Sequence, residues 1–108
     1  MMKIPGVNLV NRPSLVIAAL NVDWSLAELY TKSISATTTL TFSNVTSGNV
    51  ISVIVTNTVG SAQTVNFPAG IKWSGGSAIT SVPANRSNVY TFEHDGTTTY
   101  AAVIEDEG

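Results

Sequence analysis

Apolar and polar residues alternate with a period of two along most of the chain from Asp23 onward. In residues 38–43, "TTLTFS", Leu40 and Phe42 alternate with threonines, which predicts a strand with one buried face. Residues 49–57, "NVISVIVTN", carry apolar side chains at both odd and even positions. A strand that is apolar on both faces belongs in the middle of a sheet, covered by the leading residues or by another subunit.

The alternation continues in shorter stretches that are separated by turn residues. Residues 61–67, "SAQTVNF", predict a strand, and residues 79–82, "ITSV", predict another. Between them, residues 68–78 contain three glycines and a proline. We expect a loop there, pinned to the core by Ile71 and Trp73.

Two further stretches have clear patterns. Residues 87–94 and 97–104 predict a hairpin joined by Asp95-Gly96, in a type I′ turn with positive φ at both central residues. Residues 23–32, "DWSLAELYTK", predict a strand, although part of this stretch also suits a helix. In the strand interpretation one face carries Trp24, Leu26, Glu28 and Tyr30.

Together these elements predict an all-β fold, a small antiparallel β-sandwich or jelly-roll-like barrel of about seven to eight strands. The sandwich is expected to span residues 23–108, which form one domain. Residues 1–22 mix Pro, Gly and Asn with scattered apolar residues and predict an extended arm for anchoring or subunit exchange. The arm docks on its own domain or on a neighbour. Its apolar stretch, residues 14–22, is too short to span a membrane.

Charge is scarce in this chain. Charged residues make up 11% of the sequence, against about 25% in an average soluble domain, and Thr, Ser and Asn supply the polarity instead. Such hydroxyl-rich β surfaces are common where sheets pack in durable assemblies, which favours a homo-oligomer. The net charge of −2 and the lack of a Lys/Arg cluster argue against nucleic-acid binding. The chain has no cysteine, which excludes disulfides and thiolate chemistry.

Few residues suit catalysis. His94 is followed by Asp95, but adjacent strand residues point to opposite faces, so we interpret the pair as a hairpin tip. Asp23 and Glu28 are candidates for an acid–base pair, and no further polar cluster accompanies them. A metal site would need copies of His94 gathered on a trimer axis, which we do not favour. We expect no enzyme activity, no catalytic residue, no metal and no cofactor.

Aromatic side chains suggest a different kind of site. Trp24, Tyr30 and Trp73 are candidate stacking platforms for a sugar. The alternative is that these rings belong to the core. The core interpretation is favoured for Trp73, whereas both remain open for Trp24 and Tyr30, which share a predicted face with Glu28.

Four stretches together resemble a domain that recurs in bacteriophage virion proteins: "TTLTFSN" (38–44), "VISVIVTNT" (50–58), "TVNFPAGIKWSGG" (64–76) and "VYTFEHDGTTTYAAV" (89–103). In that family a strand ending in Phe-Pro or Trp-Pro leads into a loop with a buried Trp and a Gly-Gly pair, and a hairpin with Asp-Gly closes the sheet. The matching residues here are Phe67, Pro68, Trp73, Gly75, Gly76, Phe92, Asp95, Gly96 and Tyr100. The proline that commonly follows the Gly-Gly pair is replaced here by "SAIT" (77–80).

The resemblance implies a structural protein of the virion, without catalytic residues and often trimeric. Such domains occur in capsid decorations, head fibres and tail fibres. Because no shaft or repeat is visible, we expect a capsid decoration or head-attached accessory subunit, assembled as a homotrimer, that binds the major capsid protein or other virion proteins. The alternative is a tail-fibre or tail-tip module that binds a host-surface receptor or glycan. A depolymerase-type enzyme is disfavoured, and we expect no nucleic-acid partner and no membrane insertion.

Overall fold

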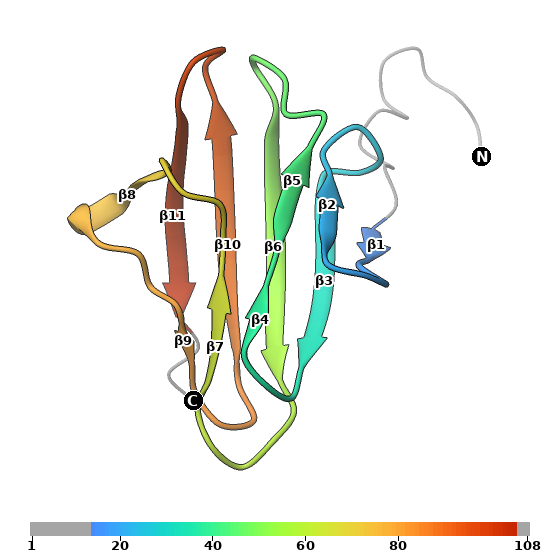
Figure 1. The fold of residues 1–108 in the computed structure, drawn as a ribbon, viewed down its shortest axis with the longest axis vertical. Coiled ribbons are helices and arrows are strands. Elements are labelled where there is room, and N and C mark those ends of the chain that lie inside the picture. The colour runs from blue at the N-terminus through green and yellow to red at the C-terminus, as the bar shows by residue number, and fades with distance from the viewer. Residues whose placement is uncertain (1–13, 106–108) are drawn as a thin grey trace, which may run out of the picture.

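The computed structural model describes residues 14–105, and these residues form a β-sandwich of two layers. In Figure 1 the layers overlap, with β4 and β5 crossing β6. The larger layer, which we call the large sheet, contains in spatial order β1 (Ser14–Val16), β3 (Leu29–Ile34), β6 (Val50–Asn57), β10 (Ser87–His94), β11 (Thr99–Glu105) and β8 (Lys72–Trp73). The second layer contains β2 (Asn21–Asp23), β5 (Thr41–Ser43), β4 (Thr38–Thr39), β7 (Gln63–Asn66) and β9 (Ser81–Val82). The predicted all-β sandwich is confirmed.

Pairing directions in the large sheet are mixed. β10 is antiparallel to both β6 and β11, whereas β1–β3, β3–β6 and β11–β8 are parallel pairs. The antiparallel arrangement that we expected therefore applies to the centre of the large sheet and not to its flanks. Alternation of side chains indicates which face of a strand is buried, and it says nothing about the direction of the neighbouring strand. Residues 14–105 form eleven strands, more than expected, because several strands have only two or three residues.

The strand interiors follow the predicted alternation. Ile51, Val53 and Val55 point into the core and are buried, while Val50 and Ile54 point outward. β6 lies between β3 and β10, which confirms the central position predicted for it.

Aromatic rings from both layers meet in the core. Tyr90 and Phe92 point inward from β10, and Phe42 and Phe67 approach from the second layer. The ring centroids of Phe67 and Tyr90 are 4.7 Å apart, and those of Phe42 and Phe92 are 5.0 Å apart. Tilted and edge-to-face contacts of this kind contribute about 0.5–1.5 kcal/mol each in addition to the burial of apolar area.

The strand predicted over residues 23–32 is wrong in its first half. Residues 24–26 form a turn, and β3 begins only after it. The four side chains expected on one face are therefore separated: the buried ones are Trp24 and Tyr30, and the exposed ones are Leu26 and Glu28.

A buried tyrosine holds this turn in place. The Tyr30 hydroxyl accepts the N–H of Ala27 at 3.0 Å and donates to the carbonyl of Asp23. Two backbone groups of the turn are thereby satisfied inside the protein, which explains why a local alternation that suits a strand gives way to a turn.

Part of the predicted arm belongs to the sandwich. β1 pairs with β3, and β2 pairs with β5. The chain between β1 and β2 is held by Lys32, whose Nζ donates to the carbonyls of Ile17 and Ala19 at 3.2 and 2.9 Å. Val22 is fully buried, so the predicted boundary between arm and domain falls inside β2. Residues 1–13 of the predicted arm lie outside the described residues.

The segment over residues 68–78 is pinned as predicted, but it is not loop throughout, because it contains β8 and a 3-10 helix at Ser74–Gly76. Ile71 and Trp73 pack against the core, and the Trp73 ring centroid lies 5.9 Å from that of Phe67. The chain then turns through Gly75-Gly76, where φ values of 85° and 89° favour glycine.

Asn57 is fully buried at the end of β6 and uses its whole side chain. Its Nδ2 donates to the carbonyls of Ser61 and Val82 at 2.8 and 3.0 Å, and its Oδ1 accepts the N–H of Val59 at 3.0 Å. One amide thus fastens the connection after β6 to β9.

Replacing Asn57 with alanine should lower the free energy of unfolding by about 2–3 kcal/mol, because the substitution leaves buried backbone groups without partners. Asn66→Ala is the matched control, since Asn66 is half-buried and donates a long hydrogen bond of 3.4 Å to Thr39. The control should change stability by about 0.5 kcal/mol or less. Urea denaturation measures both variants, and equal losses would contradict the role assigned to Asn57.

Candidate functional site

The main candidate for a binding surface is the outward-facing side of the large sheet, which we call the outer face. Strand register aligns one row of side chains across it, the central row, made of Val16, Thr31, Ile54, Val89 and Ile104. Val16 and Ile104, at the two ends of the row, are 71% and 69% exposed. Same-face neighbours on adjacent strands lie about 5 Å apart, so the central row is a continuous, largely apolar stripe.

The next two rows widen the stripe. Leu29 follows the central row along β3, and Val50 and Tyr100 lie in the row after that, on β6 and β11. All three side chains are exposed. The outer face thus presents adjoining apolar residues. Single apolar residues on a surface are normal, whereas a continuous exposed group of them indicates an interaction site.

Hydroxyl groups on the outer face bond to one another across the strands. Thr56 Oγ1 and Ser87 Oγ are 2.7 Å apart, and Ser52 Oγ and Thr91 Oγ1 are 3.4 Å apart. Because these groups already have partners, covering them with another protein surface costs less than covering unpaired hydroxyls.

Charge on the outer face is confined to one end. Glu93 and Lys72 flank Tyr100 in the row that also contains Val50, which we call the charged row. The other outward positions of the described large-sheet strands are apolar or carry hydroxyls.

The outward surface of the second layer has the opposite character. Asn21 Nδ2 donates to Thr41 Oγ1 at 2.9 Å, and Ser43 Oγ donates to Asn21 Oδ1 at 2.8 Å. Asn44 Nδ2 donates to Asp23 Oδ1 at 2.9 Å. One side of the sandwich is therefore a polar, hydrogen-bonded surface suited to water, and the other side is suited to burial.

The three aromatic residues predicted as sugar platforms lie in or against the core. Trp24 and Tyr30 are 1% and 0% exposed. Trp73 is half-buried, and its ring makes an edge-to-face contact with Phe92 at 6.0 Å. The structure does not bring the three ring faces together at the described surface.

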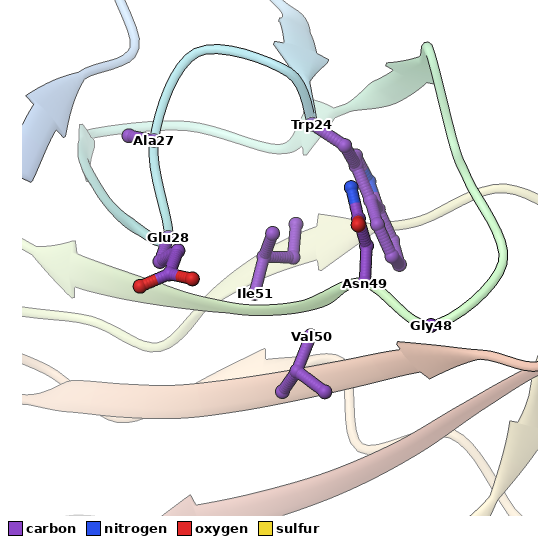
Figure 2. Close-up of a pocket in the computed structure, with 7 residues that line it drawn as sticks. All are labelled: Trp24, Ala27, Glu28, Gly48, Asn49, Val50 and Ile51. Atoms are coloured by element: carbon purple, nitrogen blue, oxygen red, sulfur yellow. The ribbon is translucent and has the colours of Figure 1, made fainter. Parts of the chain in front are cut away.

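A pocket of about 210 Å³ lies where the turn before β3 meets the start of β6. It is lined by Trp24, Ala27, Glu28, Gly48, Asn49, Val50 and Ile51. Figure 2 shows the Glu28 carboxylate and the Asn49 amide on opposite sides of Ile51, with the Trp24 ring beside Asn49. Trp24 Nε1 is buried without a hydrogen-bond partner. A carboxylate, an amide and an apolar floor suit a small molecule that carries hydroxyl groups.

The predicted hairpin near the end of the chain is present, but its turn is not type I′. The strand pairing ends at His94, and the loop spans residues 95–98. Positive φ occurs at Gly96, with 102°, and not at Asp95, whereas a type I′ turn needs it at both positions.

The side chains of the loop explain its shape. Asp95 Oδ1 accepts the backbone N–H groups of Thr97 and Thr98, each at 2.8 Å, which favours a longer turn. His94 Nδ1 forms a hydrogen bond with Thr99 Oγ1 at 2.9 Å. These contacts stabilise the hairpin.

Asp23 and Glu28 do not form a shared site. Asp23 Oδ1 accepts the hydroxyl of Ser25 at 2.6 Å, and hydrogen bonds from Ser25 and then Asn44 hold the pKa of Asp23 below its usual value. Glu28 lines the pocket, and Asp23 is not among the lining residues. Within residues 14–105, no group of three or more His, Asp or Glu side chains is placed to hold a metal ion.

In comparisons with known proteins, no family model, no curated protein and no solved structure matches this chain. In the part of the chain that the structure describes, no helix is long and apolar enough to cross a membrane.

Sequence reasoning did not identify the outer face. Val16, Ile54, Val89 and Ile104 lie on four different strands, and only the register of the sheet aligns them. The sequence signal for the outer face was the apolar second face of residues 49–57. It predicted that this face is covered, but it did not identify the residues of other strands that lie beside it.

Acid should destabilise the fold through two exposed carboxylates. The N–H groups of Thr98 and Thr97 hold the pKa of Asp95 below its usual value of 3.8, as hydrogen bonds do for Asp23. Since each folded-state pKa is depressed, the stabilisation is present above the unfolded value and is lost as the pH falls through the folded one.

Asp95→Asn keeps an acceptor oxygen but cannot titrate in this range. Its urea midpoint should therefore fall less than that of the wild type between about pH 5 and pH 2. Equal falls in the two proteins would show that the Asp95 hydrogen bonds do not contribute to the acid sensitivity.

Proposed function

We propose that this protein is a structural subunit of a bacteriophage virion, a capsid decoration or head-attached accessory protein. It acts by non-covalent contact with other virion proteins and catalyses no reaction.

The outer face is the observation that supports this proposal most. A stripe ending in Val16 and Ile104, flanked by hydroxyls that are already paired, is a surface suited to burial against protein. The residues that resemble phage virion domains support the same assignment. Phe67 and Trp73 pack against the core, and Asp95 shapes the hairpin loop.

The leading residues supply the contact with the particle surface. Residues 14–22 are part of the sandwich, so the anchoring role expected of the arm falls to residues 1–13. Binding through this segment uses main-chain and apolar contacts.

Purified full-length chain should co-sediment with particles of the encoding phage from which this subunit has been removed. Deleting residues 1–13 leaves β1 intact and should weaken this binding about tenfold or more, because the anchoring contacts are lost while the sandwich remains folded. Circular dichroism confirms that the shortened chain is folded.

A full-length chain that does not co-sediment would overturn the proposal. Unchanged binding by the shortened chain would remove residues 1–13 from the mechanism and leave the sandwich as the contact.

The pocket beside Trp24 favours one alternative, a tail-fibre or tail-tip module that binds a host-surface glycan. Glu28 and Asn49 offer an acceptor and an amide to sugar hydroxyls, and Ile51 provides an apolar floor.

Under this alternative, Asn49→Ala should reduce binding to a glycan array by about tenfold, whereas Asn66→Ala should leave it unchanged. Asn66 lies on β7 and is not a lining residue, so it controls for the loss of an amide elsewhere. A wild-type chain that binds no glycan on the array would remove this alternative.

A further inference from the structure

We infer that the outer face binds the outer face of a second copy of this chain, giving a two-fold symmetric pair of sandwiches. The inference rests on the proposed function, because the outer face is the surface that supports that function. It names a second copy of the chain as the direct partner of the outer face.

The size of the outer face suits such a pair. Strands about 4.8 Å apart with same-face residues about 6.8 Å apart give each outward residue roughly 33 Å² of flat sheet. The four rows have fourteen described positions on β3, β6, β10 and β11 and therefore cover roughly 460 Å² before side-chain relief is counted. Specific interfaces bury about 800 Å² of accessible surface per partner. Side chains that project from the sheet add accessible area and bring the outer face toward that size.

The charges on the outer face decide how two copies meet. A two-fold axis running across the strands reverses each strand relative to its mate, so opposite ends of the outer face come together. The charged row, with Glu93, then lies over the row formed by Ser33, Thr56 and Ser87. Those hydroxyls have donor capacity for a carboxylate. An axis along the strands that passes near β10 would instead bring the two Glu93 carboxylates toward each other.

The apolar residues match under the same operation. The central row of one copy covers the row of Leu29, Ser52, Thr91 and Ala102 of the other. Ile104 then lies over Ala102, and Ile54 and Val89 lie over Ser52 and Thr91, whose hydroxyls are already paired with each other. The exposed ends of the stripe at Val16 and Ile104 are removed from water. Sheets stacked in this way pack about 10 Å apart with their strands nearly aligned.

A three-fold ring requires a different contact. Each subunit of a trimer would place its outer face against another surface of its neighbour. One such surface in the described residues is the polar one around Asn21, Thr41 and Asp23, whose amides and carboxylate do not complement an apolar stripe. The two-fold pair instead places the charged row over hydroxyls.

The mass of the full-length chain in solution tests the pairing. Multi-angle light scattering and sedimentation should give twice the chain mass at concentrations above about 10 μM. Ile104→Glu should shift the protein to monomer, because it introduces a carboxylate at an end of the stripe. Leu26→Glu is the matched control, since Leu26 is also exposed and apolar but lies in the turn before β3. It should remain a dimer.

The orientation has its own test. Ser87→Lys puts a cation over Glu93 of the other copy and should tighten the dimer about two- to fivefold. Adding Glu93→Lys should reverse this gain. A dimer that Ser87→Lys leaves unchanged would overturn the orientation, and a monomeric wild type or loss of the dimer in Leu26→Glu would overturn the pairing itself.

These outcomes are separable from those of the co-sedimentation experiment. A monomeric protein that binds phage particles would contradict the pairing and support the virion function. A dimer that Ile104→Glu dissociates, but that binds no particle, would support the pairing and contradict the virion function.

Discussion

The packing of aromatic rings between the two layers is the interaction on which the rest of the structure depends. Phe42 and Phe67 from the second layer meet Tyr90 and Phe92 from the large sheet, with the centroids of facing rings 4.7 to 5.0 Å apart. Trp73 joins them from the edge of the large sheet and so fixes the glycine-rich loop. Because these rings lie within or against the core, the exposed apolar residues of the outer face are mainly aliphatic, and they suit a flat protein contact better than stacking on a sugar.

The fold was predictable where the relevant pattern is local. Alternation identified the inward residues Ile51, Val53 and Val55 and the central place of β6, because burial of one face depends on the strand itself. The sequence did not predict the turn at residues 24–26. This turn depends on hydrogen bonds of the Tyr30 hydroxyl with the backbone of Asp23 and Ala27, and these groups come together only in the folded chain. Parallel pairing of β3 with β6 was missed for a similar reason: register and direction are properties of two strands together.

The candidate site was less predictable than the fold. The sequence indicated hydroxyl-rich strands and an apolar second face, which are the ingredients of the outer face, but their alignment into one stripe needed the strand order. The sequence left open whether Trp24 and Tyr30 belong to the core or to a sugar site, because it predicted that they share a face with Glu28. In the structure both aromatic side chains are buried, whereas Glu28 is exposed. The difference between the two sides of the sandwich is visible only when the layers are assembled.

Strand pairs that are distant in sequence have a consequence for how this chain reaches its native state. β4 and β7 are parallel neighbours although β5 and the whole of β6 lie between them in the chain, and β6 pairs with β10 across a similar separation. Long stretches of backbone must close before such contacts form, so folding is expected to take milliseconds to seconds rather than microseconds. During that interval the apolar stripe is available to other nascent copies, and the near absence of charge on it offers little protection from aggregation.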